Sequence, residues 1–116
     1  MRSISIQVQP SRSPGIDMPR ITELFRNLVS RIDLVRSHSF DHGFDDGAYF
    51  NFTFGTLCPA DLWHLIQEQV FRAPGHAAHM ARASMAMCST DEEWNDYVQL
   101  FHWDPSVPQE ELPEAP

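Results

Sequence analysis

Histidine and cysteine are the side chains with which this chain could hold a metal ion, and it has six of the first and two of the second. His76 and His79 are three residues apart, a spacing that puts both rings on one face of a helix. Cys88 or His102 would be the further ligand to test beside them. The chain contains neither an HExxH nor a CxxC motif. Surface or hydrogen-bonded histidines are therefore the preferred interpretation, and we expect no metal or other cofactor.

The same residue types could supply a nucleophile. Cys58 stands just before Pro59 at the start of an expected helix, where the helix dipole favours the thiolate, and His64 or His102 could act as its base. The chain has no serine elbow, no glycine-rich phosphate loop and no paired-carboxylate signature. The sequence thus leaves enzyme activity uncertain, favours a protein without one, and identifies no catalytic residue.

Two acidic patches are the residues best suited to binding another protein. The first is a predicted loop in which Trp94 and Tyr97 would anchor an interface while neighbouring carboxylates meet Arg or Lys. The second is a predicted hairpin. The partner-binding residues that we predict are Asp91, Glu92, Glu93, Trp94, Asp96 and Tyr97 in the loop and Asp41, Asp45 and Asp46 in the hairpin. The alternative for the loop is that Trp94 packs under the sheet and the acids are only solvated.

The charge of the chain changes along its length. The first 36 residues carry net +3 and the rest net −11, which together make the formal charge of −8. Direct nucleic-acid binding is not expected, because affinity for phosphate backbones comes largely from Lys and Arg. An acidic surface would instead steer a basic protein partner, although solubility alone is the alternative explanation.

The sequence lacks the segments that would direct the protein into or across a membrane. No apolar run approaches the length of a membrane helix, and the N-terminus has no secretory signal, so we expect a cytoplasmic protein that does not bind a membrane. Cys58 and Cys88 are then expected to be reduced thiols.

Periodicity predicts the elements that carry these residues. Ile4, Ile6 and Val8 alternate with polar residues, as in a strand with one buried face, and the apolar spacing from Pro19 to Ile32 predicts a helix. The further predicted elements are a strand from Leu34 to Asp41, a turn from Asp41 to Gly47, a strand from Ala48 to Phe54, a helix from Pro59 to Arg72, a helical turn from His76 to Ala81, a strand from Arg82 to Cys88, a polar loop from Ser89 to Asp96 and a strand from Tyr97 to Trp103.

The strand from Ala48 to Phe54 is superficially similar to the aromatic strand by which RNA-recognition modules stack bases. Those modules begin the motif with Lys or Arg, whereas Asp45 and Asp46 stand here. Core packing by the phenylalanines of this strand is the preferred explanation, because inverted charge removes the attraction to RNA.

The element order β-α-β-β-α-β with one extra C-terminal strand predicts an α+β fold of the ferredoxin-like split type, an antiparallel sheet with helices on one face. We expect one domain over residues 1–105, since 116 residues suffice for a single core, and a mobile Pro/Glu-rich tail over 106–116. The open face of the sheet is the place to look for function, but the fold by itself implies no function.

In size, acidity and the stretches Trp94–Tyr97 and Leu100–Pro105, the chain resembles the small immunity proteins of bacterial contact-dependent growth inhibition and related polymorphic toxin systems. The resemblance implies a stoichiometric inhibitor that binds and neutralises a cognate, basic toxin domain. The alternative is a small ferredoxin-like enzyme or ligand-binding domain with a His/Cys-lined pocket on the open sheet face. His64, His76, His79 and His102 would line it.

Overall fold

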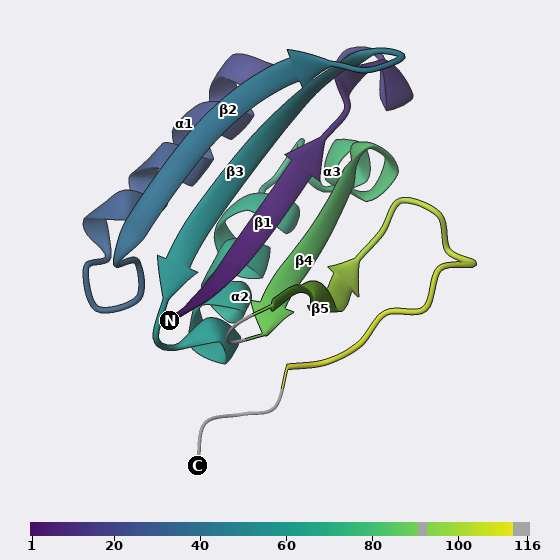
Figure 1. Ribbon diagram of the computed structural model, residues 1–116. Coiled ribbons are helices and arrows are strands. Elements are labelled where there is room, and N and C mark those ends of the chain that lie inside the picture. The colour runs from purple at the N-terminus through teal and green to yellow at the C-terminus, as the bar shows by residue number, and fades with distance from the viewer. Residues whose placement is uncertain (91–92, 113–116) are drawn as a thin grey trace.

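The computed structural model describes residues 1–90 and 93–112, and the side chains of 1–89 and 97–112 among them. This part of the chain forms one antiparallel sheet in the order β2-β3-β1-β4-β5, and the helices lie on one of its faces (Figure 1). The α+β fold with an antiparallel sheet is thereby confirmed. The strands are β1 (Arg2–Val8), β2 (Ser37–Phe44), β3 (Ala48–Thr56), β4 (Ser84–Thr90) and β5 (Glu93–Phe101). The helices are α1 (Met18–Asn27), α2 (Pro59–Ile66) and α3 (Ala77–Ala83), with short 3-10 turns η1 (Pro10–Arg12) and η2 (Leu28–Ser30) and a π-helical turn η3 (Gln67–Phe71).

β1 lies at the centre of the sheet, and its two faces differ as the alternation predicts. Ile4, Ile6 and Val8 are fully buried beneath the helices, whereas the residues between them are only partly buried on the opposite face. Burial of three aliphatic side chains contributes several kcal/mol in total, on the order of 1.5–3 kcal/mol each. This strand therefore separates a hydrophobic core from an open, polar sheet face.

α1 begins and buries its apolar face as predicted, but it ends earlier. Asp17 caps it by accepting a hydrogen bond from the Arg20 backbone N–H at 3.1 Å. The predicted helix reached Ile32, yet the chain passes through a 3-10 turn after Asn27 and leaves Ile32 77% exposed. The reason is that the residues after the turn re-enter the core, where Val35 is buried in its place.

A group of aromatic rings joins α1 to the sheet. The Phe25 ring of α1 stacks on Phe52 of β3, with ring centroids 4.2 Å apart, and lies 6.1 Å from Phe54. Phe40 of β2 contacts the Phe52 ring edge-on at 5.2 Å. Phe52 and Phe54 are buried and Phe50 is partly buried, so the phenylalanines of β3 do serve packing, as predicted.

The β2–β3 hairpin is tighter than the predicted turn. β2 continues to Phe44, so Asp41 lies in the strand and not in the turn. The turn itself needs left-handed backbone, with φ of 55° at Asp46 and 136° at Gly47, and Asp45 N donates to Gly47 O at 3.0 Å. The extension of β2 carries the side chain of Asp41 onto the open face of the sheet.

Two boundaries in the second half of the chain also differ from the prediction. The helix from Pro59 becomes α2 and then a π-helical turn before Arg72. The predicted polar loop from Ser89 to Asp96 is wrong in its extent, because β4 runs to Thr90 and β5 begins at Glu93. Pairing of Glu93 with Thr90 outweighs the low strand propensity of glutamate at this position. The predicted last strand likewise ends at Phe101, before His102 and Trp103.

The segment after β5 folds back along the domain. Ser106 donates its backbone N–H and its hydroxyl to the Asp104 carboxylate, and these hydrogen bonds hold the pKa of Asp104 below its usual value. Glu110 N then donates to Gln99 O of β5 at 2.7 Å, and Leu112 packs against the core. Mobility of the tail 106–116 stays a prediction, and 113–116 lie outside the described residues. No helix in the described part of the chain is long and apolar enough to cross a membrane.

Candidate partner-binding surface on the open sheet face

The face of the sheet that no described helix covers is built from the polar alternate residues of the strands (Figure 1). The register places Ser5 of β1 opposite Thr53 of β3, and their hydroxyls share a hydrogen bond of 3.0 Å. Nearby, Tyr49 of β3 lies over Gly43 of β2, where a Cβ atom would collide with the Tyr49 ring. The face is thus a polar platform with hydroxyl groups and an aromatic ring upon it.

A chain of hydrogen bonds crosses this platform from a guanidinium to a carboxylate. Arg12 Nε donates to Gln9 at 2.8 Å, Gln9 to Gln7 at 2.9 Å, Gln7 to Asn51 at 3.2 Å, and Asn51 to Asp41 at 3.1 Å. The residues at the two ends determine in which direction every hydrogen bond of this chain is donated, because a guanidinium can only donate and a carboxylate can only accept. Every amide is therefore aligned the same way, and the chain orients the Asp41 carboxylate on the exposed surface of β2.

A hollow of about 300 Å³ lies on the same platform, over β1, β3, β4 and β5. Its lining residues are Ser3, Ser5, Thr53, Met87, Ser89 and Tyr97. Ser3 N donates to the Ser89 hydroxyl at 3.1 Å, which fixes one wall. Tyr97 is 52% exposed at the rim, so its ring is free to pack against a partner. Hydroxyls, a methionine and a tyrosine around one hollow suit an apolar or aromatic side chain with a polar end.

The two predicted acidic patches contribute unequally to this surface. Asp41 and Tyr97 both lie on the open face, at the two edge strands of the sheet. Asp45 and Asp46 are exposed at the tip of the hairpin, next to Phe44, which is 79% exposed. The structure therefore brings one residue from each patch onto a single face.

The other predicted residues of the acidic loop lie outside the described side chains. Asp91 and Glu92 lie outside the described residues, and Glu93, Trp94 and Asp96 belong to β5 by their backbone alone. Their role in binding, and the alternative that Trp94 packs under the sheet, stay predictions.

The histidines and cysteines do not converge on the open face. Among the described residues, no three groups of the kind that bind metals come together. His79 of α3 shares a 2.6 Å hydrogen bond with the Ser13 hydroxyl, and His102 Nδ1 accepts from Asp104 N at 2.9 Å. His76 Nδ1 is buried and has no hydrogen-bond partner among the residues that the structure describes. The described lining of the hollow on the open face includes neither a histidine nor a cysteine. Neither cysteine forms a disulfide: Cys58 is half-buried at the start of α2, and Cys88 is buried in β4.

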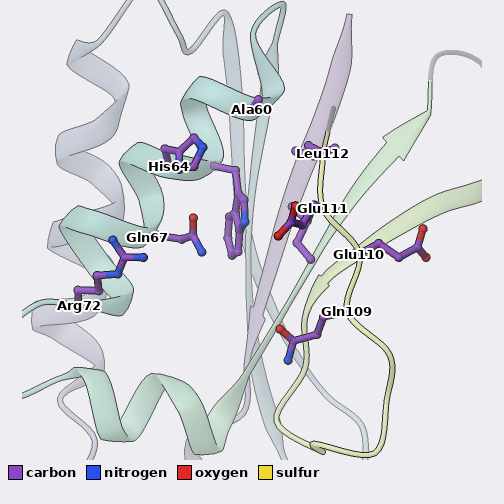
Figure 2. Close-up of a pocket in the computed structure, with 10 residues that line it drawn as sticks. Ala60, His64, Gln67, Arg72, Gln109, Glu110, Glu111 and Leu112 are labelled. Atoms are coloured by element: carbon purple, nitrogen blue, oxygen red, sulfur yellow. The ribbon is translucent and has the colours of Figure 1, made fainter. Parts of the chain in front are cut away.

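A second cavity, of about 430 Å³, was not anticipated from the sequence (Figure 2). It lies between α2 with its π-helical extension and the returning segment 109–112. Its lining residues are Ala60, Trp63, His64, Gln67, Arg72, Leu100, Gln109, Glu110, Glu111 and Leu112. Figure 2 shows Gln67 and Glu111 pointing toward one another across it. Leu112, an isolated apolar residue in a polar tail, was the one signal that this segment would return to the core.

Comparisons with known proteins give no relative from which a function could be carried over. No protein-family model, no curated protein and no solved structure matches this chain. We therefore infer a function from the chemistry of the surfaces described above.

Proposed function

We propose that the protein is a stoichiometric protein-binding inhibitor of the immunity type, which neutralises a basic toxin domain by binding it with the open face of the sheet. The observation that supports this is the placement of Asp41 and Tyr97, one from each acidic patch, on the single face that no described helix covers. The hollow beside Tyr97 lies on the same face.

The chemistry of this face suits a cationic protein surface. Asp41 is exposed, and Asn51 holds its carboxylate in place, so it can pair with an Arg or Lys of the partner with little loss of side-chain entropy. The hollow accepts an apolar or aromatic side chain, with Tyr97 and Met87 packing beside it. Tyrosine and methionine are enriched in protein interfaces for this reason. Asp45 and Asp46 add to the negative field that steers a basic partner.

The ferredoxin-like classification is part of the same proposal. Its support is the succession β1-α1-β2-β3-α2-β4 and the position of β1 between β3 and β4, with β3 between β1 and β2, all antiparallel. α3 and β5 are then additions before and after the fourth strand. β5 forms part of the open face, because Tyr97 belongs to it.

The proposal predicts that a gene for a toxin domain lies beside the gene for this chain, and the experiment that tests the proposal uses that toxin domain. We expect co-expression of the chain to restore growth to cells that produce the toxin domain, and the purified proteins to form a 1:1 complex. We also expect Tyr97→Ala to weaken the complex. Leu57→Ala, a change at an apolar residue that is 62% exposed, follows the end of β3 and does not line the hollow, should leave the complex intact. Absence of both protection and complex would contradict the proposal.

The alternative, a small ligand-binding domain, is supported by the second cavity and not by the open face. His64 and Arg72 bring donors to that cavity, and Glu111 brings a carboxylate. Replacing His64 with Ala should then abolish binding of a small ligand identified by thermal-shift screening. The same variant should still neutralise a toxin if the first proposal is correct.

A further inference from the structure

The two edges of the sheet differ in how they are protected. At the β5 edge the ladder has two register shifts, and Glu110 N of the returning segment donates to Gln99 O. The β2 edge has no such cover in the described part of the chain: its eight residues pair with β3 in one unbroken register and include neither Lys nor Pro. Proteins normally blunt an exposed edge by bulges, lysines, prolines or a covering segment. The β2 edge is thus open to another strand.

The register identifies the backbone groups that β2 presents at this edge. Asp45 N donates to Gly47 O, so Asp45 and Gly47 are a hydrogen-bonded pair. The pairs Gly43 with Tyr49 and Asp41 with Asn51 follow at steps of two residues and are therefore of the same kind. Hydrogen-bonded and non-hydrogen-bonded pairs alternate in an antiparallel ladder. The N–H and C=O groups of the residues between them, His38, Phe40 and His42, therefore point away from β3 toward the free edge.

We propose that this edge binds a second copy of the chain, β2 against β2 in antiparallel orientation about a twofold axis at Phe40. The sequence of β2 is self-complementary about that point. His38 falls opposite His42 of the second copy, and Ser39 falls opposite Asp41, whose carboxylate can accept its hydroxyl. The product is a continuous ten-stranded sheet with an isologous interface.

The charges at the two ends of β2 support a second copy over any other occupant. Arg36, exposed just before β2, would lie opposite Phe44 of the second copy and next to its Asp45 and Asp46. The guanidinium can pair with these carboxylates and stack on the Phe44 ring, which is 79% exposed in the single chain. Twofold symmetry produces this contact twice.

The dimer is compatible with the proposed function but does not depend on it. Edge-to-edge pairing extends the sheet without covering either face. Both open faces then lie on the same side of the dimer, and each can bind one partner. The tests below need no partner, so their failure is distinguishable from failure of the toxin experiment.

Sedimentation equilibrium of the full chain tests the proposal directly. We expect a concentration-dependent monomer–dimer equilibrium. Arg36→Glu and Asp45→Arg should each raise the dimer dissociation constant about tenfold, because two attractive contacts become repulsive. An equimolar mixture of the two variants should recover wild-type affinity as a heterodimer, since both contacts are then attractive again. Arg82→Glu, the same charge change at an exposed residue of α3, should leave the dissociation constant unchanged.

A backbone substitution gives a second readout. His42→Pro removes an N–H that points to the free edge, and edge strands tolerate proline at such positions, so the variant should remain folded by circular dichroism and become monomeric. A wild-type protein that stays monomeric at every concentration overturns the proposal, as does a dimer that neither charge reversal weakens. A monomer whose β2 pairs with a strand of another protein overturns it as well.

Discussion

Asp41 shows how an exposed carboxylate can be made ready for binding by its neighbours. It is the last acceptor in a chain of aligned hydrogen bonds that begins at Arg12 of η1. Such aligned bonds strengthen one another, and each amide has both a donor and an acceptor role fulfilled. An exposed aspartate normally loses side-chain freedom when it forms an ion pair, but here Asn51 has already restricted it.

The contributions of Asp41 and Tyr97 to partner binding should separate kinetically. Asp41→Lys is expected to slow association, and the effect should shrink at high salt, because exposed charges act mainly through steering. Tyr97→Ala should speed dissociation and cost about 2 kcal/mol, as expected for an aromatic anchor beside a hollow. Surface plasmon resonance against the toxin domain measures both rates. Asp61→Lys, the same charge change on α2, is the control for Asp41→Lys; equal slowing by the two would contradict a local role for Asp41.

At the scale of elements, α1 shows how a short helix obtains its position. Its buried face, with Ile21 and Phe25 fully enclosed, packs on β3, and its first turn is closed by the Asp17 side chain. Because a helix of ten residues has little stability alone, packing and the cap together define its bounds. The cap also stops the chain from continuing the helix back into the loop that follows η1.

Removing the Asp17 cap should lower the stability of the protein by a predictable amount. Asp17→Ala should lower the free energy of unfolding by about 1 kcal/mol, because the Arg20 N–H loses its acceptor. Urea denaturation measures it. Glu23→Ala is the control, since it removes only an exposed ion pair with Arg20 and should cost less than about 0.5 kcal/mol. Equal costs would show that lost negative charge near the helix start, not the cap, is responsible.

At the scale of the whole molecule, the returning segment packs back against the rest of the described chain. Leu112 packs against the core, and Glu110 adds a backbone hydrogen bond to the edge of β5. These contacts close one side of the second cavity and cover one edge of the sheet. The predicted domain boundary at residue 105 was placed from composition and stays a prediction.

Shortening the Leu112 side chain should weaken the attachment of the returning segment while the rest of the chain stays folded. Leu112→Ala is expected to cost about 1 kcal/mol or less, since the side chain is only partly buried, and to speed amide hydrogen exchange at Glu110. Nuclear magnetic resonance measures the exchange residue by residue. Leu57→Ala, at an exposed leucine, should leave the Glu110 exchange rate unchanged. Unchanged exchange in Leu112→Ala would show that the segment is held by other contacts.

The sequence by itself determined the local periodicities and the composition. Alternation in β1 and the helical spacing before Asn27 are properties of adjacent residues, so they identify which side chains are buried without knowledge of the fold. Asp41 and Tyr97 were singled out for the same kind of reason, as acidic or aromatic residues among others of their type.

Only the tertiary structure decided which of these residues meet. Strand order and register join segments far apart in the chain, so the pairing of Ser5 with Thr53, the end of β2 at Phe44 and the start of β5 at Glu93 depend on partners that no local pattern identifies. The same holds for the hollow on the open face, whose lining comes from four strands. A one-residue change of register would move every such side chain to the opposite face, which is why pairing, and not composition, creates the candidate site.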